Sequence, residues 1–88
     1  MSRTKWCEVI VFKHGRMDWP LENAIVSGVV SGCGLHTPDV RTDRNGKATI
    51  TWASGGHLEK IYVKGGLFEP TVSYQGPFEE GETRKLNY

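Results

Sequence analysis

The sequence predicts an all-β fold: an antiparallel two-sheet sandwich of about seven strands. Its 88 residues include 11 glycines and four prolines, which suit short strands and turns. No long run of alanine, leucine, glutamate and lysine indicates a helix. Strand-like segments separated by turn residues recur at intervals of roughly ten residues, a spacing typical of β-sandwiches.

The length predicts one domain, residues 1–88, with an ordered core over about residues 6–88. A domain of this size buries roughly 60–65% of the surface of its unfolded chain, so its core is thin. The residues that we expect in the core are Ala24, Val26, Ile50, Trp52, Ile61, Val63, Val72 and Leu86.

The first predicted strand, residues 6–13, is apolar on both faces. Cys7, Val9 and Val11 alternate with Trp6, Glu8, Ile10 and Phe12. The opposite sheet of a sandwich covers only one face of a strand, so the other needs a different cover.

We predict that the face formed by Trp6, Ile10 and Phe12 contacts another protein chain, most simply a second copy. If this strand lies at a sheet edge, main-chain pairing would strengthen the contact. The alternative is that the loop over residues 14–22 folds back and covers the face with Trp19 or Met17.

The second strand is predicted at residues 23–31, where Gly28 indicates a bulge or a close approach to a neighbouring backbone. A glycine-containing loop then leads to a short strand that begins at Val40.

The clearest local pattern follows, a turn from Asp43 to Gly46 that leads into an alternating strand. Aspartate first and glycine last suit a type I turn closed by a glycine with positive φ. Such a turn pairs Thr42 with Ala48 and Val40 with Ile50, which keeps apolar residues opposite each other. A two-residue Asn-Gly turn would shift the register by one and turn a whole face over.

We therefore predict a bulged hairpin. Its core face carries Val40, Ala48, Ile50 and Trp52, and its outer face carries Arg41, Thr49 and Thr51.

Three strands complete the prediction, at residues 60–64, 68–74 and 83–88. Alternation points Ile61 and Val63 inward and Lys60, Tyr62 and Lys64 outward. Pro70 predicts an edge strand at 68–74, because proline cannot donate to a β-ladder.

Four segments in this order resemble the carboxypeptidase regulatory-like and transthyretin-like (prealbumin-like) sandwich domains, which share an immunoglobulin-like architecture. They are Pro-Leu-Glu-Asn-Ala-Ile-Val at 20–26, Thr-Asp-Arg-Asn-Gly-Lys-Ala-Thr-Ile at 42–50, Ile-Tyr-Val-Lys-Gly at 61–65 and Gly-Glu-Thr at 81–83. The resemblance covers roughly residues 9–86. It implies a non-catalytic domain that packs on a partner domain, assembles or binds sugar. The residues with which some members bind hormone or hydrolyse a purine product have no match here, so no site is carried over.

The two cysteines have two interpretations. If the first two strands pair as neighbours, Cys7 and Cys33 could form a disulfide that stabilises the fold by roughly 3 kcal/mol. Otherwise Cys7 is a small core residue and Cys33 is a free thiol in a glycine loop.

Metal and catalytic motifs are weak, so we expect no cofactor and no enzyme. Cys33 and His36 form one short-spaced pair, with His14 and His57 elsewhere, whereas structural zinc needs two such pairs. Asp39, Asp43 and Asn45 lack the glutamate that would close a calcium loop. There is no nucleophile elbow and no phosphate-binding loop.

Charge gives no sign of a nucleic-acid or membrane partner. Eleven basic and ten acidic residues are spread along the chain, for a net charge of +1. No apolar run approaches the ~20 residues of a spanning helix. Cys7-Glu8-Val9 interrupts what would be the apolar region of a signal peptide, and the compartment stays open.

The aromatic residues suggest a ligand contact. Three tryptophans and three tyrosines exceed the need of a thin core, and Trp19 lies in a loop with glycine, aspartate and proline. Exposed flat rings can stack on sugars; alternatively, the tryptophans serve core and loop packing. We expect a non-catalytic module for protein–protein interaction or structural assembly, or alternatively a carbohydrate-binding module that uses exposed aromatics.

Overall fold

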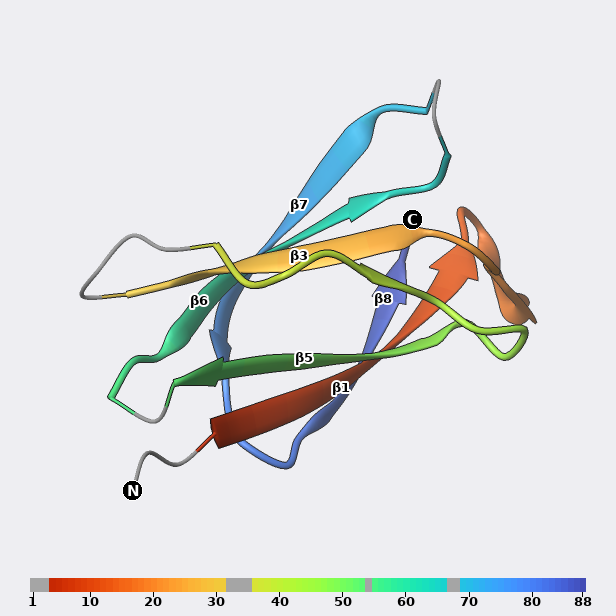
Figure 1. The fold of residues 1–88 in the computed structure, drawn as a ribbon. Coiled ribbons are helices and arrows are strands. Elements are labelled where there is room, and N and C mark those ends of the chain that lie inside the picture. The colour runs from red at the N-terminus through yellow and green to blue at the C-terminus, as the bar shows by residue number, and fades with distance from the viewer. Residues whose placement is uncertain (1–3, 32–35, 54, 67–68) are drawn as a thin grey trace.

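The computed structural model describes residues 4–31, 36–53, 55–66 and 69–88, with the backbone alone for residues 16 and 17. Within these residues it contains eight strands and no helix (Figure 1). No helix that could span a membrane is therefore present in the described part of the chain. The strands are β1 (Thr4–Lys13), β2 (Arg16–Pro20), β3 (Ile25–Val30), β4 (Val40–Arg41), β5 (Lys47–Ala53), β6 (Leu58–Lys64), β7 (Thr71–Phe78) and β8 (Thr83–Asn87).

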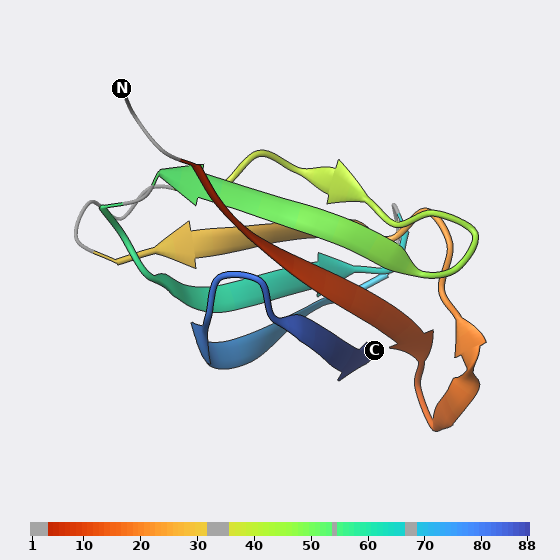
Figure 2. The ribbon, with the colours of Figure 1, turned by 90° about the horizontal axis from the view of Figure 1, so that it is seen from below.

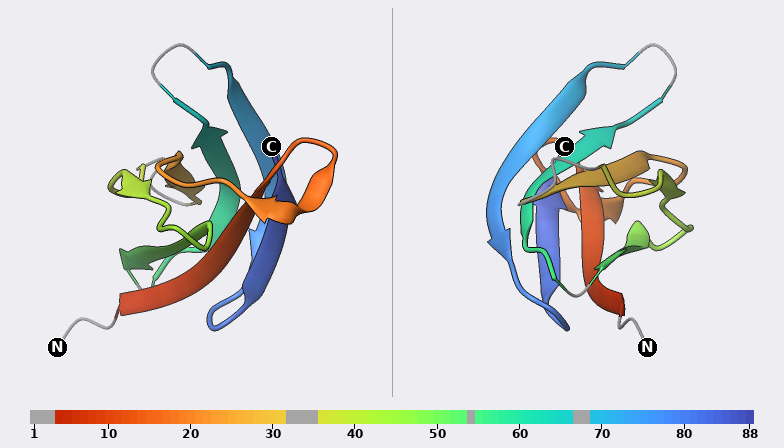
Figure 3. Two further views of the ribbon diagram at one scale, coloured as in Figure 1. Left: turned by 90° about the vertical axis from the view of Figure 1, so that its right-hand side faces the viewer. Right: turned by 60° about the vertical axis from the view of Figure 1, so that its left-hand side comes forward.

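The strands form two four-stranded sheets that pack face to face, which confirms the predicted all-β sandwich (Figure 2). Sheet A has the order β2-β1-β5, with β8 also paired to β1, and sheet B has the order β4-β3-β6-β7. The pairs are antiparallel except that β8 runs parallel to β1 (Figure 3). The strand beyond the expected seven is β2, which lies in the predicted loop over residues 14–22.

The core lies between the sheets, where seven of the eight predicted core residues are buried. The exception is Val72, which is only half-buried. Leu58 and Phe78 were not predicted in the core, yet both are buried and they pair with each other across a bulge between β6 and β7. Glu59 is an extra residue of β6 opposite β3 and puts Leu58 out of the alternation. Phe78 follows Gly76-Pro77, a dipeptide typical of turns, which hid the end of β7. The full cluster is Cys7, Val9, Val11, Ala24, Val26, Val30, Ala48, Ile50, Trp52, Leu58, Ile61, Val63, Phe78 and Leu86.

The bulged turn before β5 is confirmed. Gly46 has φ of 76° and its N–H donates to the Asp43 carbonyl at 2.9 Å, while the Asp43 N–H donates to the Lys47 carbonyl at 2.9 Å. The Asp43 carboxylate accepts from the N–H groups of Lys47 and Asn45 at 3.0 and 2.8 Å. These two bonds hold the pKa of Asp43 below its usual value.

The predicted hairpin around this turn is wrong, because β4 and β5 belong to different sheets. β4 pairs with β3, and β5 pairs with β1. The reason lies at Thr42, whose N–H donates to the Ala24 carbonyl at 2.9 Å and whose hydroxyl donates to the Leu21 carbonyl at 2.6 Å. Thr42 is thereby bonded to the chain just before β3, and the turn carries the chain from one sheet to the other.

The predicted core and outer faces of these strands are correct, although the strands pair with other partners. Ala48, Ile50 and Trp52 are buried, and Val40 packs against the same core from the opposite sheet. Arg41, Thr49 and Thr51 are exposed as expected.

Candidate interaction surface

The outer face of sheet A is centred on β1, whose two faces differ as the alternation predicts. Cys7, Val9 and Val11 are completely buried. On the other face Trp6 is 45% exposed, while Ile10 and Phe12 are half-buried. We call Trp6, Ile10 and Phe12 the outer stripe.

Polar side chains flank the outer stripe on both sides. The β1 register places Ile10 between Lys47 of β5 and Lys85 of β8. Side chains at such positions lie about 5 Å apart, so the lysine stems can cover part of Ile10 while their ammonium groups stay in water. Of the other outward positions, Glu8 lies between Thr49 and Thr83, Trp6 lies beside Thr51, and Phe12 lies between Asn87 and the apolar Pro20.

The condition for edge pairing, that β1 lies at the edge of its sheet, is not met. Glu8, Val9 and Ile10 each pair with β5 on one side and with β8 on the other. β1 is therefore a central strand whose backbone is engaged in ladders on both sides. Any association through this face uses side chains.

The segment after β1 folds back on it, but only at one end. β2 pairs with β1 at Phe12 and Lys13. Trp19 of β2 is 52% exposed, and the Lys13 ammonium lies 5.2 Å from the centre of its ring. β2 has no pairing with β1 at Trp6 or Ile10. The side chain of Met17 lies outside the described part of the structure.

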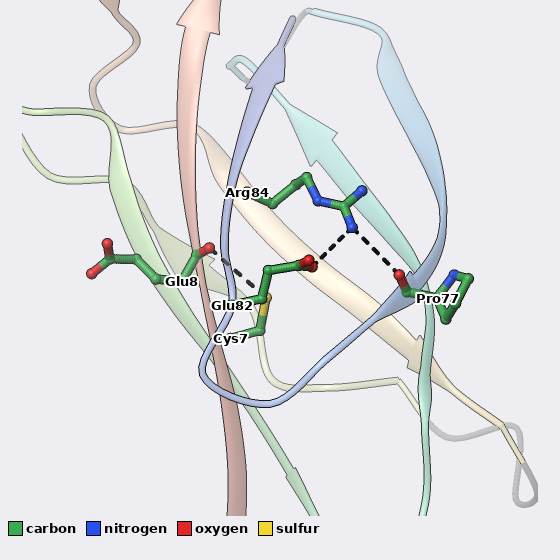
Figure 4. A network of polar contacts seen from close by, with 5 residues as sticks. All are labelled: Cys7, Glu8, Pro77, Glu82 and Arg84. Carbon is green, nitrogen blue, oxygen red and sulfur yellow. Dashed lines mark hydrogen bonds and ion pairs between the residues drawn. The ribbon is translucent and has the colours of Figure 1, made fainter.

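A polar network links the end of β7 to the start of β8, beside Cys7 (Figure 4). The Arg84 guanidinium donates to the Glu82 carboxylate at 2.9 Å and to the Pro77 carbonyl at 3.5 Å, and it lies 4.8 Å from the centre of the Phe78 ring. We did not predict this network. The spacing of Glu82 and Arg84, two residues apart, is the signal that places both on one face of a strand.

Cys7 is an inert thiol in this setting. Its Sγ donates to the Glu8 carbonyl at 3.8 Å. Burial, and to a smaller extent the Glu82 carboxylate, raise the pKa of the Cys7 thiol to about 11. A thiol with so high a pKa holds little thiolate at neutral pH and is a poor nucleophile or metal ligand.

The premise of the predicted disulfide is wrong, because β1 and β3 lie in different sheets. Cys7 is a free thiol, and Cys33 lies outside the described residues. Within the described residues no three His, Cys, Asp or Glu side chains group in a way that could hold a metal ion.

Two of the open grooves in the described structure lie in different places, one between the two sheets and one within sheet B. One, of about 450 Å³, runs between β7 and β8; it is lined by Ser73, Tyr74, Gln75, Phe78, Arg84, Lys85, Leu86 and Asn87. The Tyr74 hydroxyl crosses between these two strands and donates to the Asn87 carbonyl at 2.7 Å. The other, of about 520 Å³, lies at the bulged end of β6; it is lined by Ser31, His57, Leu58, Glu59, Lys60, Gln75, Gly76 and Pro77.

No family model and no curated protein matches the chain. Among solved structures it is similar to one described as "The Bacillus anthracis TIE protein", with a TM-score of 0.52 and 19% sequence identity. The match covers 96% of this chain and 16% of that chain. At this identity the likeness shows the fold alone, and this chain spans only a small part of the length of that protein.

Proposed function

We propose that this protein is a non-catalytic β-sandwich module that associates with a second copy of itself through the outer stripe. The observation that carries the proposal is the 45% exposure of Trp6 on a face that also holds Ile10 and Phe12. Aromatic side chains dominate interface energetics because each buries a large apolar area. An exposed tryptophan beside further apolar groups is typical of a contact surface.

The charges around the outer stripe favour a second copy over an unrelated partner. Glu8 lies between Trp6 and Ile10, and Lys47 and Lys85 flank Ile10. A two-fold axis that passes between Glu8 and Ile10 would bring Glu8 of one copy toward the lysines of the other. Both partners of such an ion pair are then supplied by one surface, as an isologous interface requires.

Two further considerations support a module of this kind. The resemblance to carboxypeptidase regulatory-like and transthyretin-like domains implies a non-catalytic domain that packs on a partner domain, assembles or binds sugar. In the similar solved structure, the matching unit is a small part of a longer chain.

The test is molar mass by light scattering over a wide range of protein concentration. We expect concentration-dependent dimers, and we expect Trp6→Glu and Ile10→Glu to be monomers, because a buried unpaired carboxylate is costly. Trp19→Glu is the matched control, since it changes an equally exposed tryptophan outside the stripe and should still dimerise. Circular dichroism shows that each variant is folded. Wild-type protein that stays monomeric throughout, or a Trp6→Glu variant that dimerises normally, contradicts the proposal.

Carbohydrate binding through Trp19 is the second candidate. The 52% exposure of its ring on β2 favours it, because a flat exposed ring can stack on a sugar. Titration with soluble neutral glycans should then change the tryptophan fluorescence, and Trp19→Ala should abolish the change while Trp6→Ala keeps it. A response that persists in Trp19→Ala would exclude this residue as the contact.

A further inference from the structure

We propose that the outer face of sheet B, opposite the outer stripe, is a binding surface for an anionic polysaccharide whose sugars carry carboxylates. The proposal is independent of dimerisation through sheet A. It stands on the distribution of charge, on the setting of Tyr62 and on the polar groups around it.

The surface is built on β6. Ile61 and Val63 point into the core, so Lys60, Tyr62 and Lys64 point outward. The neighbouring strands add hydroxyl and amide groups on the same face: Tyr62 lies between Ser27 and Ser73, Lys60 beside Gln75, and Lys64 beside Thr71. Ile25 separates Lys64 from Arg41 at the β4 edge. We call Arg41, Lys60, Tyr62 and Lys64 the cationic face.

This face is positively charged, although the whole chain is nearly neutral, with 11 basic and 10 acidic residues. The outward positions paired across β3, β4, β6 and β7 carry three cations and no carboxylate. Of the acidic residues nearest in sequence, Glu59 in the β6 bulge lines a groove together with Lys60, whereas Asp39 precedes β4 and Glu69 precedes β7. Within the described residues, none of the three cations forms an ion pair. An anion would therefore meet positive charge without displacing a carboxylate.

Tyr62 supplies an aromatic ring at the centre of the face. Its ring stacks with that of His36, with centroids 6.1 Å apart and planes at 29°. The Lys60 ammonium lies 5.9 Å from the centre of the Tyr62 ring. The half-buried ring thus holds the Lys60 ammonium on the face, where ammonium and hydroxyl groups match the carboxylate and hydroxyls of an acidic sugar.

The spacing favours a polymer over a single sugar. Lys60 and Lys64 are four residues apart on one strand, about 13 Å, with Tyr62 midway between them. Lysines whose backbone positions lie that far apart are served by a ligand whose charge repeats along its length.

The backbone of sheet B favours a polysaccharide over an acidic peptide. Extended peptides gain most of their affinity by adding a strand at a sheet edge. The cationic face instead centres on β6, which pairs with β3 on one side and β7 on the other. A peptide lying across it would find side chains alone for its own amide groups and would lack the main-chain ladder that gives edge-bound peptides most of their affinity.

The test is calorimetric titration of the full chain with sodium polygalacturonate, with dextran as the neutral polysaccharide and poly-L-glutamate as the acidic polypeptide. We expect polygalacturonate to bind, dextran not to bind and poly-L-glutamate to bind less tightly. Binding should weaken with added salt, because screening reduces the attraction between exposed charges.

Paired variants distinguish binding at the cationic face from attraction to the net charge of the protein. The double substitution Lys60→Gln with Lys64→Gln should lower the affinity about tenfold or more, because it removes both charge-assisted contacts. The control, Lys47→Gln with Lys85→Gln, removes the same charge from sheet A and should bind as wild type does. Tyr62→Thr, which keeps a strand-forming residue, should also weaken binding. All titrations use a protein concentration at which the wild type is monomeric, because a dimer would bind a polymer at two faces and raise the apparent affinity.

Three outcomes would overturn the inference. Absence of polygalacturonate binding removes the site. Equal losses in the two lysine double variants show attraction to net charge rather than to this face. Poly-L-glutamate binding as tightly as polygalacturonate shows that the face recognises acidic chains in general and gives no preference for sugar.

Discussion

Cys7 shows how strongly burial changes the chemistry of one residue. The raised pKa of about 11, against 9.0 for an ordinary thiol, lowers the thiolate fraction at neutral pH about 100-fold. Complete burial adds a steric barrier, since no reagent reaches Sγ while β1, β5 and β8 remain paired.

We therefore expect Cys7 to resist thiol reagents until the protein unfolds. The measurement uses a Cys33→Ser background, so that the signal comes from Cys7 alone, and follows labelling with and without denaturant. Labelling should be slow in buffer and fast in denaturant. Rapid labelling of the folded protein would mean that β1 opens readily or that the thiol is accessible.

Thr42 shows why the contacts of single residues were only partly predictable from the sequence. Its place beside the turn was clear from the letters Asp-Arg-Asn-Gly, because turn chemistry is local. Its partners were not, because the Leu21 and Ala24 carbonyls lie about twenty residues away in the chain. No local pattern specifies a bond of that range.

At the scale of single elements, the backbone of β3 lies close to its neighbours at Gly28, as the mid-strand glycine predicts. Gly28 exchanges hydrogen bonds with the buried Thr37: its N–H donates to the threonine hydroxyl, and its carbonyl accepts from the threonine N–H, both at 2.8 Å. A Cβ at this position would lie 2.5 Å from Leu58 Cδ1 and 3.1 Å from the Lys60 carbonyl oxygen. Leu58 is itself completely buried and cannot move into solvent.

Gly28→Ala should therefore destabilise the protein by about 1–3 kcal/mol, the usual cost of overpacking a core. Urea unfolding measures the change. Gly55→Ala is the matched control, since nothing lies within 4 Å of its would-be Cβ and its backbone is not left-handed. A Gly28→Ala variant as stable as Gly55→Ala would show that β3 and β6 separate at little cost.

Strand faces were predictable at this scale and strand neighbours were not. Alternation placed Trp6, Ile10 and Phe12 on one face and Lys60, Tyr62 and Lys64 on another, because the period of two is local. The lysines that flank Ile10 come from β5 and β8, and only the register reveals them. The same holds for the hydroxyl groups around Tyr62.

For the whole molecule, composition and turn spacing were enough to predict a two-sheet sandwich. They did not predict which strands pair. β1 and β8 are the most distant strands in the sequence, and they lie side by side in sheet A. Such pairing follows from the packing of the complete core, where Val11 and Leu86 are buried next to each other in register.

The parallel pairing of β1 and β8 has a mechanical consequence. The N-terminal end of β1 and the C-terminal end of β8 point to opposite ends of the sandwich (Figure 1). A pulling force applied at these two ends runs along both strands, so it loads the register from Glu8–Thr83 to Phe12–Asn87 in shear. Hydrogen bonds in shear share the load and break together, whereas an antiparallel hairpin pulled at its two ends opens one bond at a time. The strand order of sheet A thus predicts a high resistance to force applied along this direction.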